Sequence, residues 1–344
     1  MKRVSIFFSI VSVLILAGLV VAALNLQSLS DWWFLRSYQP TSEIAALAER
    51  SSLNAAGTNL FYVSDPEVNE AEAFNQNCPF RERSYVLGCF ADRRIYIFDV
   101  TDERLDGVKE VTVAHEMLHV VYSRLDAGQE IALRKLLDAQ LTKITNQRIL
   151  DLVQQYRTQD PSSIYNEMHS IFGTEVAELS PELDAHYAQY FIDRTQVVKL
   201  SQAYESVFTE LRDQADDLLA EINRLKDSLP ATEAKISDLK TVINTIEAQL
   251  DAFDADINQA REDNDGAAEL IAVNQYNSLL GQFRSTIDEH NGLVESYNST
   301  VESINQQVKT YNSLVAEQAE LLDSIDSKQQ ELWSFWIPQY TKPQ

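Results

Sequence analysis

Residues 111–122 read V-T-V-A-H-E-M-L-H-V-V-Y, in which His115 and His119 stand four positions apart inside an apolar run. On an α-helix, residues i and i+4 lie on the same face, so both imidazoles can reach one metal ion. Glu116 projects close to that face and can take a proton from a metal-bound water. Zn²⁺ suits this arrangement because three protein ligands leave its fourth position open for water, whose pKa it lowers. The stretch therefore predicts a metal-binding helix over about residues 106–125.

Strand and helix patterns surround this motif. Residues 59–63 and the pair 84–90 and 94–100 are rich in β-branched and aromatic side chains, which predicts a strand followed by an antiparallel hairpin. Apolar periodicity and proline starts then predict helices over 129–157, 161–173 and from 181 onward. This order indicates an α+β domain over residues 31–200. The free edge of the strand before the motif helix could bind an extended peptide by strand addition.

A catalytic zinc needs a third protein ligand. The metzincin pattern would require glycine at position 122 and histidine at 125, where Tyr122 and Leu125 stand. A better candidate is Glu167, in the stretch N-E-M-H-S at 166–170 on the helix that Pro161 opens.

On these two motifs the chain resembles the gluzincin group of zinc metallopeptidases, whose third ligand commonly sits in an N-E-x-x-S-like helix. The resemblance covers about residues 55–200 and implies a zincin-like fold. It implies zinc held by His115, His119 and Glu167, with Glu116 as general base and general acid.

The chain departs from the thermolysin pattern in two respects. The gap from the motif to Glu167 is longer, and Ile171 stands where an aspartate would orient a ligand histidine. Glu175 and His169 are competing third ligands. His186, on the helix from 181, is the candidate for stabilising the charge of a tetrahedral intermediate, although its spacing also fits a core position.

The N-terminal composition predicts a location. Residues 4–24 are apolar, follow Lys2 and Arg3, and precede an aromatic cluster at 32–34, so residues 1–30 are expected to form a transmembrane anchor with the body outside the cytoplasm. A cleaved signal peptide is the alternative. Cys78 and Cys89 are the only cysteines, and an oxidising compartment favours one disulfide between them over a buried thiol pair.

Charge excludes one class of partner. The chain has 28 Lys and Arg against 52 Asp and Glu, a formal net charge of −24. Nucleic-acid binding needs a basic surface, so no nucleic-acid partner is expected. The acidic residues are spread along the chain, which is typical of a charge that serves solubility.

The C-terminal part has a different period. Apolar residues recur at alternating three- and four-residue spacing from about 208 to 257 and again from 280 to 325, with a polar break at 261–266. Such heptads predict a coiled coil, and two arms of about 60 residues predict a long antiparallel helical hairpin over 201–332. Pro230 is expected to kink or interrupt the first arm. Residues 333–344 form an aromatic tail that could dock on the body or lie at a membrane interface.

These features predict a membrane-anchored, extracytoplasmic zinc metallopeptidase with a peptide or protein substrate. The coiled coil would position the enzyme or recruit a protein partner. The alternative is a non-catalytic scaffold that acts through its coiled coil and carries a degenerate zincin domain.

Overall fold

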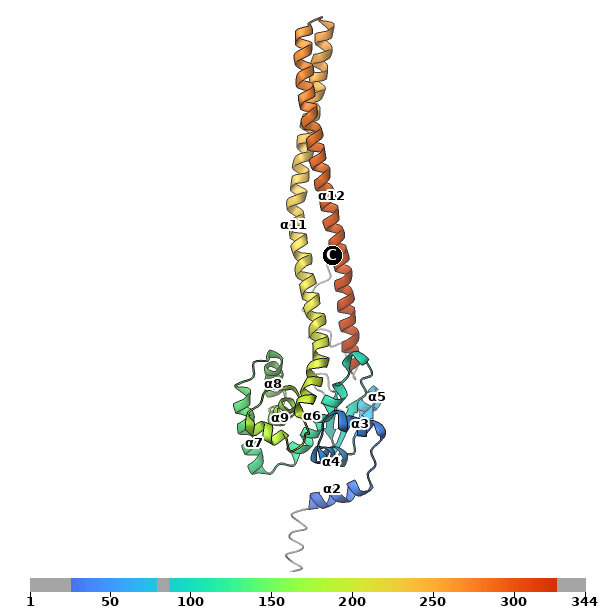
Figure 1. Cartoon of the computed structure of the whole chain (residues 1–344), viewed down its shortest axis with the longest axis vertical. Coiled ribbons are helices and arrows are strands. Elements are labelled where there is room, and N and C mark those ends of the chain that lie inside the picture. The colour runs from blue at the N-terminus through green and yellow to red at the C-terminus, as the bar shows by residue number, and fades with distance from the viewer. Residues whose placement is uncertain (1–25, 79–86, 327–344) are drawn as a thin grey trace, which may run out of the picture. The chain divides into compact units, whose positions relative to one another are not determined.

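The computed structural model describes residues 26–78 and 87–326 (Figure 1). The chain divides into two compact units: residues up to 208 together with those from 319 onward, and residues 209–318. The main hydrophobic core lies in the first unit.

The described part of the first unit is mostly helical. Its elements follow in the order α2 (Leu26–Ser37), α3 (Ser42–Arg50), α4 (Ala55–Val63), β1 (Glu67–Asn69), α5 (Ala71–Asn77), β2 (Gly88–Ala91), β3 (Arg94–Phe98), a 3-10 turn (Glu103–Leu105), α6 (Val108–Ser123), α7 (Ala127–Leu141), α8 (Gln147–Gln159), α9 (Ile164–Glu175), α10 (Pro181–Tyr187), the first turns of α11 (Arg194–Glu262) and the last turns of α12 (Gly266–Ile325).

The motif helix α6 lies at the centre of this unit, where it contacts α3, α4, α9, β2 and β3. Its apolar run explains this position, because Val113, Ala114, Met117 and Leu118 are all fully buried. Burial of that stripe, about 1.5–3 kcal/mol for each large side chain, holds the helix in the core. The predicted helix over 106–125 is therefore confirmed as α6.

The only sheet among the described residues has three strands in the order β1-β3-β2. β1 runs parallel to β3, and β2 pairs antiparallel with β3 through Cys89 and Tyr96. The two-residue turn between them places Asp92 and Arg93 at positive φ, 49° and 67°, as a type I′ hairpin turn requires. The predicted hairpin is present, with a first strand that begins at Gly88.

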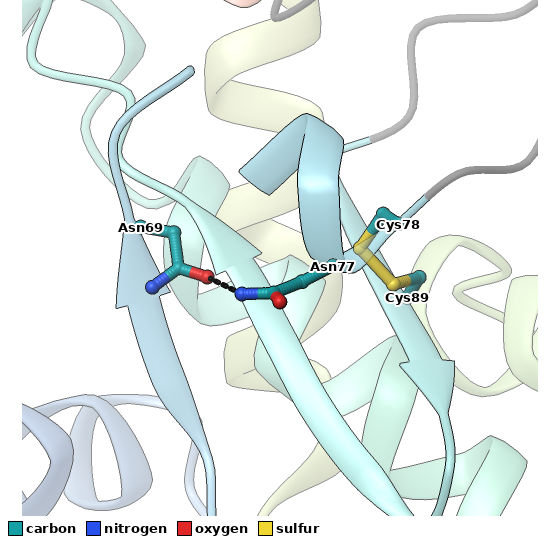
Figure 2. Close-up of a disulfide and its surroundings, with 4 residues drawn as sticks. All are labelled: Asn69, Asn77, Cys78 and Cys89. Carbon is teal, nitrogen blue, oxygen red and sulfur yellow. Dashed lines mark hydrogen bonds between the residues drawn. A yellow bond between two sulfur atoms is a disulfide. The ribbon is translucent and has the colours of Figure 1, made fainter. Parts of the chain in front are cut away.

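A disulfide joins Cys78, at the end of α5, to Cys89 in β2 (Figure 2). The two Cα atoms lie 6.1 Å apart. Close by, the Asn77 side chain donates a hydrogen bond to Asn69 at 3.0 Å. The disulfide agrees with the sequence prediction and ties α5 to the edge of the sheet.

The expected fold class is wrong. The chain is mostly helical rather than α+β, because its strands are few and short and helices form most of the core. Residues 59–63, expected as a strand, belong to α4. The Asn54 side chain caps that helix by accepting from the backbone N–H groups of Ala56 and Gly57, and this cap prevails over local β-propensity.

The segment 129–157 also differs from its prediction, because Asn146 caps a new helix and divides the segment into α7 and α8. In the part of the chain that the structure describes, no helix has the length and apolar character to cross a bilayer. The anchor expected at residues 1–30 falls mostly on residues 1–25, outside the described ranges, as does the aromatic tail at 333–344.

The second unit confirms the predicted long helical hairpin. The parts of α11 and α12 within residues 209–318 are joined by the short turn 263–265, where Asn264 has a φ of 58°. Asp265 caps α12 by accepting from the backbone N–H groups of Ala267 and Ala268, both at 3.1 Å. Helix α11 continues through Pro230, so the predicted interruption there does not occur.

Candidate metal centre

Helix α6 brings the three motif residues together. The rings of His115 and His119 meet edge to face, with centroids 4.8 Å apart and an angle of 82° between their planes. One ligand atom from each of His115, Glu116 and His119 can be chosen so that all lie within 4.8 Å of one another. This cluster could therefore hold a metal ion.

Glu167 of α9 faces the two histidines. Its Oε2 lies 3.6 Å from His115 Nε2, and its Oε1 lies 3.7 Å from His119 Nε2. Two ligands that share a tetrahedral zinc at ordinary bond lengths are about 3.4 Å apart. Two imidazoles and one carboxylate are a suitable donor set for a divalent metal ion, and the observed spacing fits a shared ion.

The close packing of α9 against α6 depends on Gly173. A Cβ atom at this position would lie 2.3 Å from Leu118 Cδ1 and 2.9 Å from Tyr187 Cε1. Since real Cβ atoms do not approach so closely, any larger residue here would require Leu118 or Tyr187 to move. Gly173 therefore keeps Glu167 within reach of the motif.

The carboxylate of Glu167 is nearly buried. Burial raises its pKa, but the imidazoles of His119 and His115 and hydrogen bonds from His115 and Tyr156 outweigh burial and leave the pKa below its ordinary value. The ionised form, which a metal ion requires, is thus favoured. Sequence analysis missed Tyr156, because it comes from α8 and no local pattern connects it to Glu167.

Ser170 supplies an orienting contact that sequence analysis left unassigned. Its Oγ lies 3.2 Å from Nδ1 of His119 in a fully buried position. A hydroxyl that accepts from Nδ1–H leaves Nε2 free to bind a metal, which is the usual arrangement around a ligand histidine. The available signal was spacing, since Glu167 and Ser170 lie three positions apart and share one face of α9.

The competing third ligands have other partners. Glu175 forms an ion pair with Arg148, which also pairs with Glu205. His169 is fully buried, and its Nε2 lies 2.9 Å from Nε2 of His186. Among the three candidates, Glu167 is the one whose carboxylate faces both motif histidines.

His186, expected to stabilise a reaction intermediate, lies on α10 beside His169. Its ring also contacts those of Tyr187 and Tyr190, with centroids 5.3 and 5.7 Å away. Burial lowers the pKa of both His169 and His186, which favours the neutral pair. The catalytic role of His186 stays a prediction, and the contacts of its Nε2 are with His169.

The edge strand β2 passes directly beside Glu116. A Cβ atom at Gly88 would lie 2.8 Å from Oε1 of Glu116 and 2.5 Å from the methyl group of Thr112. Within the described residues, β2 pairs with β3 alone. A strand edge and a buried carboxylate therefore adjoin the candidate metal centre.

No family model, curated protein or solved structure matches the chain.

Proposed function

We propose that the chain is a zinc-dependent peptidase whose metal is held by His115, His119 and Glu167. The supporting observation is that the two oxygens of Glu167 lie 3.6 and 3.7 Å from the Nε2 atoms of the two histidines. A set of two histidines and one glutamate is typical of catalytic zinc and leaves a coordination position open. The two imidazole ligands make calcium and magnesium, which prefer oxygen donors, poorer candidates.

Zinc, when bound, supplies Lewis acidity and lowers the pKa of water. The chain supplies the proton transfers. Glu116 lies beside the histidines and is almost completely buried, so its carboxylate is held near the reacting groups. It takes a proton from the attacking water and delivers that proton to the departing amine, as a general base and then a general acid.

The proposed substrate is an extended peptide. Backbone groups on the edge of β2 can pair with a peptide by strand addition. Because Gly88 leaves no side chain between this strand and Glu116, a carbonyl group of the added strand can come close to the carboxylate. In this proposal the edge of the sheet positions the substrate, while β3 contributes Ile95 and Ile97 to the core.

The disulfide supports the proposed location outside the cytoplasm, because such bonds persist in oxidising compartments. The membrane association and the partner of the coiled coil stay predictions.

Metal content and proteolysis of the purified full chain test the proposal. We expect about one zinc per wild-type chain at neutral pH. Glu116→Gln should keep the zinc and lose peptide hydrolysis, whereas His115→Ala and Glu167→Gln should lose zinc. Glu175→Gln is the matched control on α9 and should keep it. A wild-type chain that takes up no zinc, or a Glu116→Gln variant with full activity, would exclude the proposal.

The second candidate, a non-catalytic scaffold, is favoured by one observation. Leu270 and Ile271, close to the turn of the hairpin, are largely exposed and offer an apolar site to a partner. If the scaffold function is right, Leu270→Ser with Ile271→Ser abolishes function in cells, while Glu116→Gln has no effect. The peptidase proposal requires a phenotype for Glu116→Gln.

A further inference from the structure

Helix α2 exposes an apolar face. Leu26, Leu29, Trp32 and Trp33 are 65, 51, 57 and 71% exposed. At about 100° per residue these side chains occupy an arc of about 120° on one side of the helix. No residue of α2 is buried, so the body of the protein does not cover this face.

The opposite side of α2 is fixed to the body. Asp31, which projects away from the apolar arc, pairs with Arg124 at 2.5 Å. Arg124 is the C-cap residue of α6. Phe34 stacks on Tyr38 just beyond the helix, and the Tyr38 ring lies 5.4 Å from that of Tyr62 in α4. The apolar face is therefore held outward by specific contacts.

A short helix with an exposed apolar face is marginal in water. Tryptophan and leucine on one face of a helix are the residues that enter the boundary between lipid headgroups and acyl chains. The segment directly before α2 gives a second argument, because residues 4–24 contain no charged side chain. Arg36 lies over the ring of Trp32, 5.6 Å from its centroid, and provides a cation for lipid phosphate.

We propose that α2 lies along the surface of a phospholipid bilayer, with Leu26, Leu29, Trp32 and Trp33 in the headgroup boundary. Apolar burial is the main source of binding, since the acidic chain gains nothing from an anionic surface. Through Asp31 and Arg124, the bilayer contact sets the direction of α6. The metal centre would then act on peptide segments close to the membrane.

This inference rests on α2 and not on the metal, so the two proposals can fail separately. The test uses the full chain with Trp333→Phe and Trp336→Phe, which leaves Trp32 and Trp33 as its only tryptophans. The protein is reconstituted into phosphatidylcholine vesicles that contain lipid brominated at a shallow or a deep acyl position. We expect tryptophan emission shifted to shorter wavelength and quenched more by the shallow bromines. His115→Ala should not alter this result.

Ile131 on α7, 58% exposed, provides the matched control. Ile131→Trp is placed in a chain whose four other tryptophans are phenylalanine, and its emission should stay unquenched. Water-like emission of Trp32 and Trp33 overturns the proposal. Equal quenching of the α2 tryptophans and of the tryptophan at position 131 does so as well. So does a shift to shorter wavelength that brominated lipid does not quench, because a second copy or another protein would then cover the face.

Discussion

Replacing Gly173 with alanine tests whether the packing of α9 on α6 builds the metal centre. In an open helical position, Gly→Ala stabilises by about 0.5–1 kcal/mol. At Gly173 the new methyl group would lie 2.3 Å from Leu118 Cδ1 and 2.9 Å from Tyr187 Cε1. Both neighbours are fully buried, and the Tyr187 hydroxyl donates to the carbonyl of His169 at 2.7 Å, so neither can move freely.

Overpacking of this kind costs about 1–3 kcal/mol, which exceeds the gain in helix propensity. Gly173→Ala should therefore lower the free energy of unfolding by about 1–2 kcal/mol. Because relief of the contact moves α9 away from α6, the distances from Glu167 to the two histidines should increase. Zinc affinity should then fall about tenfold or more, as it does when ligand orientation is disturbed.

Urea unfolding measures the stability, and competition with a chromophoric chelator measures zinc affinity. Gly281→Ala is the matched control, because nothing lies within 4 Å of a Cβ at that position in α12. It should stabilise slightly and leave zinc binding unchanged. If Gly173→Ala behaves like this control, the close approach of the two helices does not determine the site.

Three further changes have defined outcomes. Ser170→Ala should weaken zinc binding about 10- to 100-fold in the same competition assay, and Ser170→Thr should keep part of the affinity. Equal zinc affinity in the wild type and both variants would exclude an orienting role for Ser170. Replacing Cys78 and Cys89 with serine should lower the free energy of unfolding in urea by about 3 kcal/mol, because the unfolded chain regains the entropy of the opened loop. An unchanged free energy would show that the disulfide does not constrain the unfolded chain. Burial and the nearby Glu175 raise the pKa of Glu205 to about 7 against the charge of Arg148. Since the folded form then binds the proton more tightly, the free energy of unfolding should fall as the pH rises from about 4.5 to about 7. Glu205→Gln should flatten this part of the curve of stability against pH. An unchanged slope in that variant would assign the pH dependence to another group.

Local patterns predicted the features that depend on local geometry. The spacing of His115 and His119 requires only a helix, and the structure has one there. The hairpin of α11 and α12 follows from a repeated apolar period. The cysteine pair is close in sequence, so its disulfide needed no knowledge of the remaining fold.

The errors have two causes, a helix cap that outweighs local strand propensity and contacts between distant segments. Strand propensity at residues 59–63 gave way to the helix that Asn54 caps. Sequence placed Glu167 ahead of Glu175 but could not show why Glu175 is occupied elsewhere. That depends on Arg148, which pairs with Glu175 from 27 positions away. The contribution of Tyr156 to Glu167 is equally invisible, since it requires α8 and α9 to pack together.

The same reasoning explains why a mostly helical chain can still bring together two histidines and a glutamate that could hold a metal ion. The candidate metal centre takes its side chains from α6 and α9, and Gly173 of α9 lets the two helices pack closely. The sheet adds an edge next to Glu116 but provides no ligand to the site. A sequence motif can therefore predict the local arrangement of this site more securely than the fold around it, because that arrangement depends on a few side chains and the fold depends on many contacts.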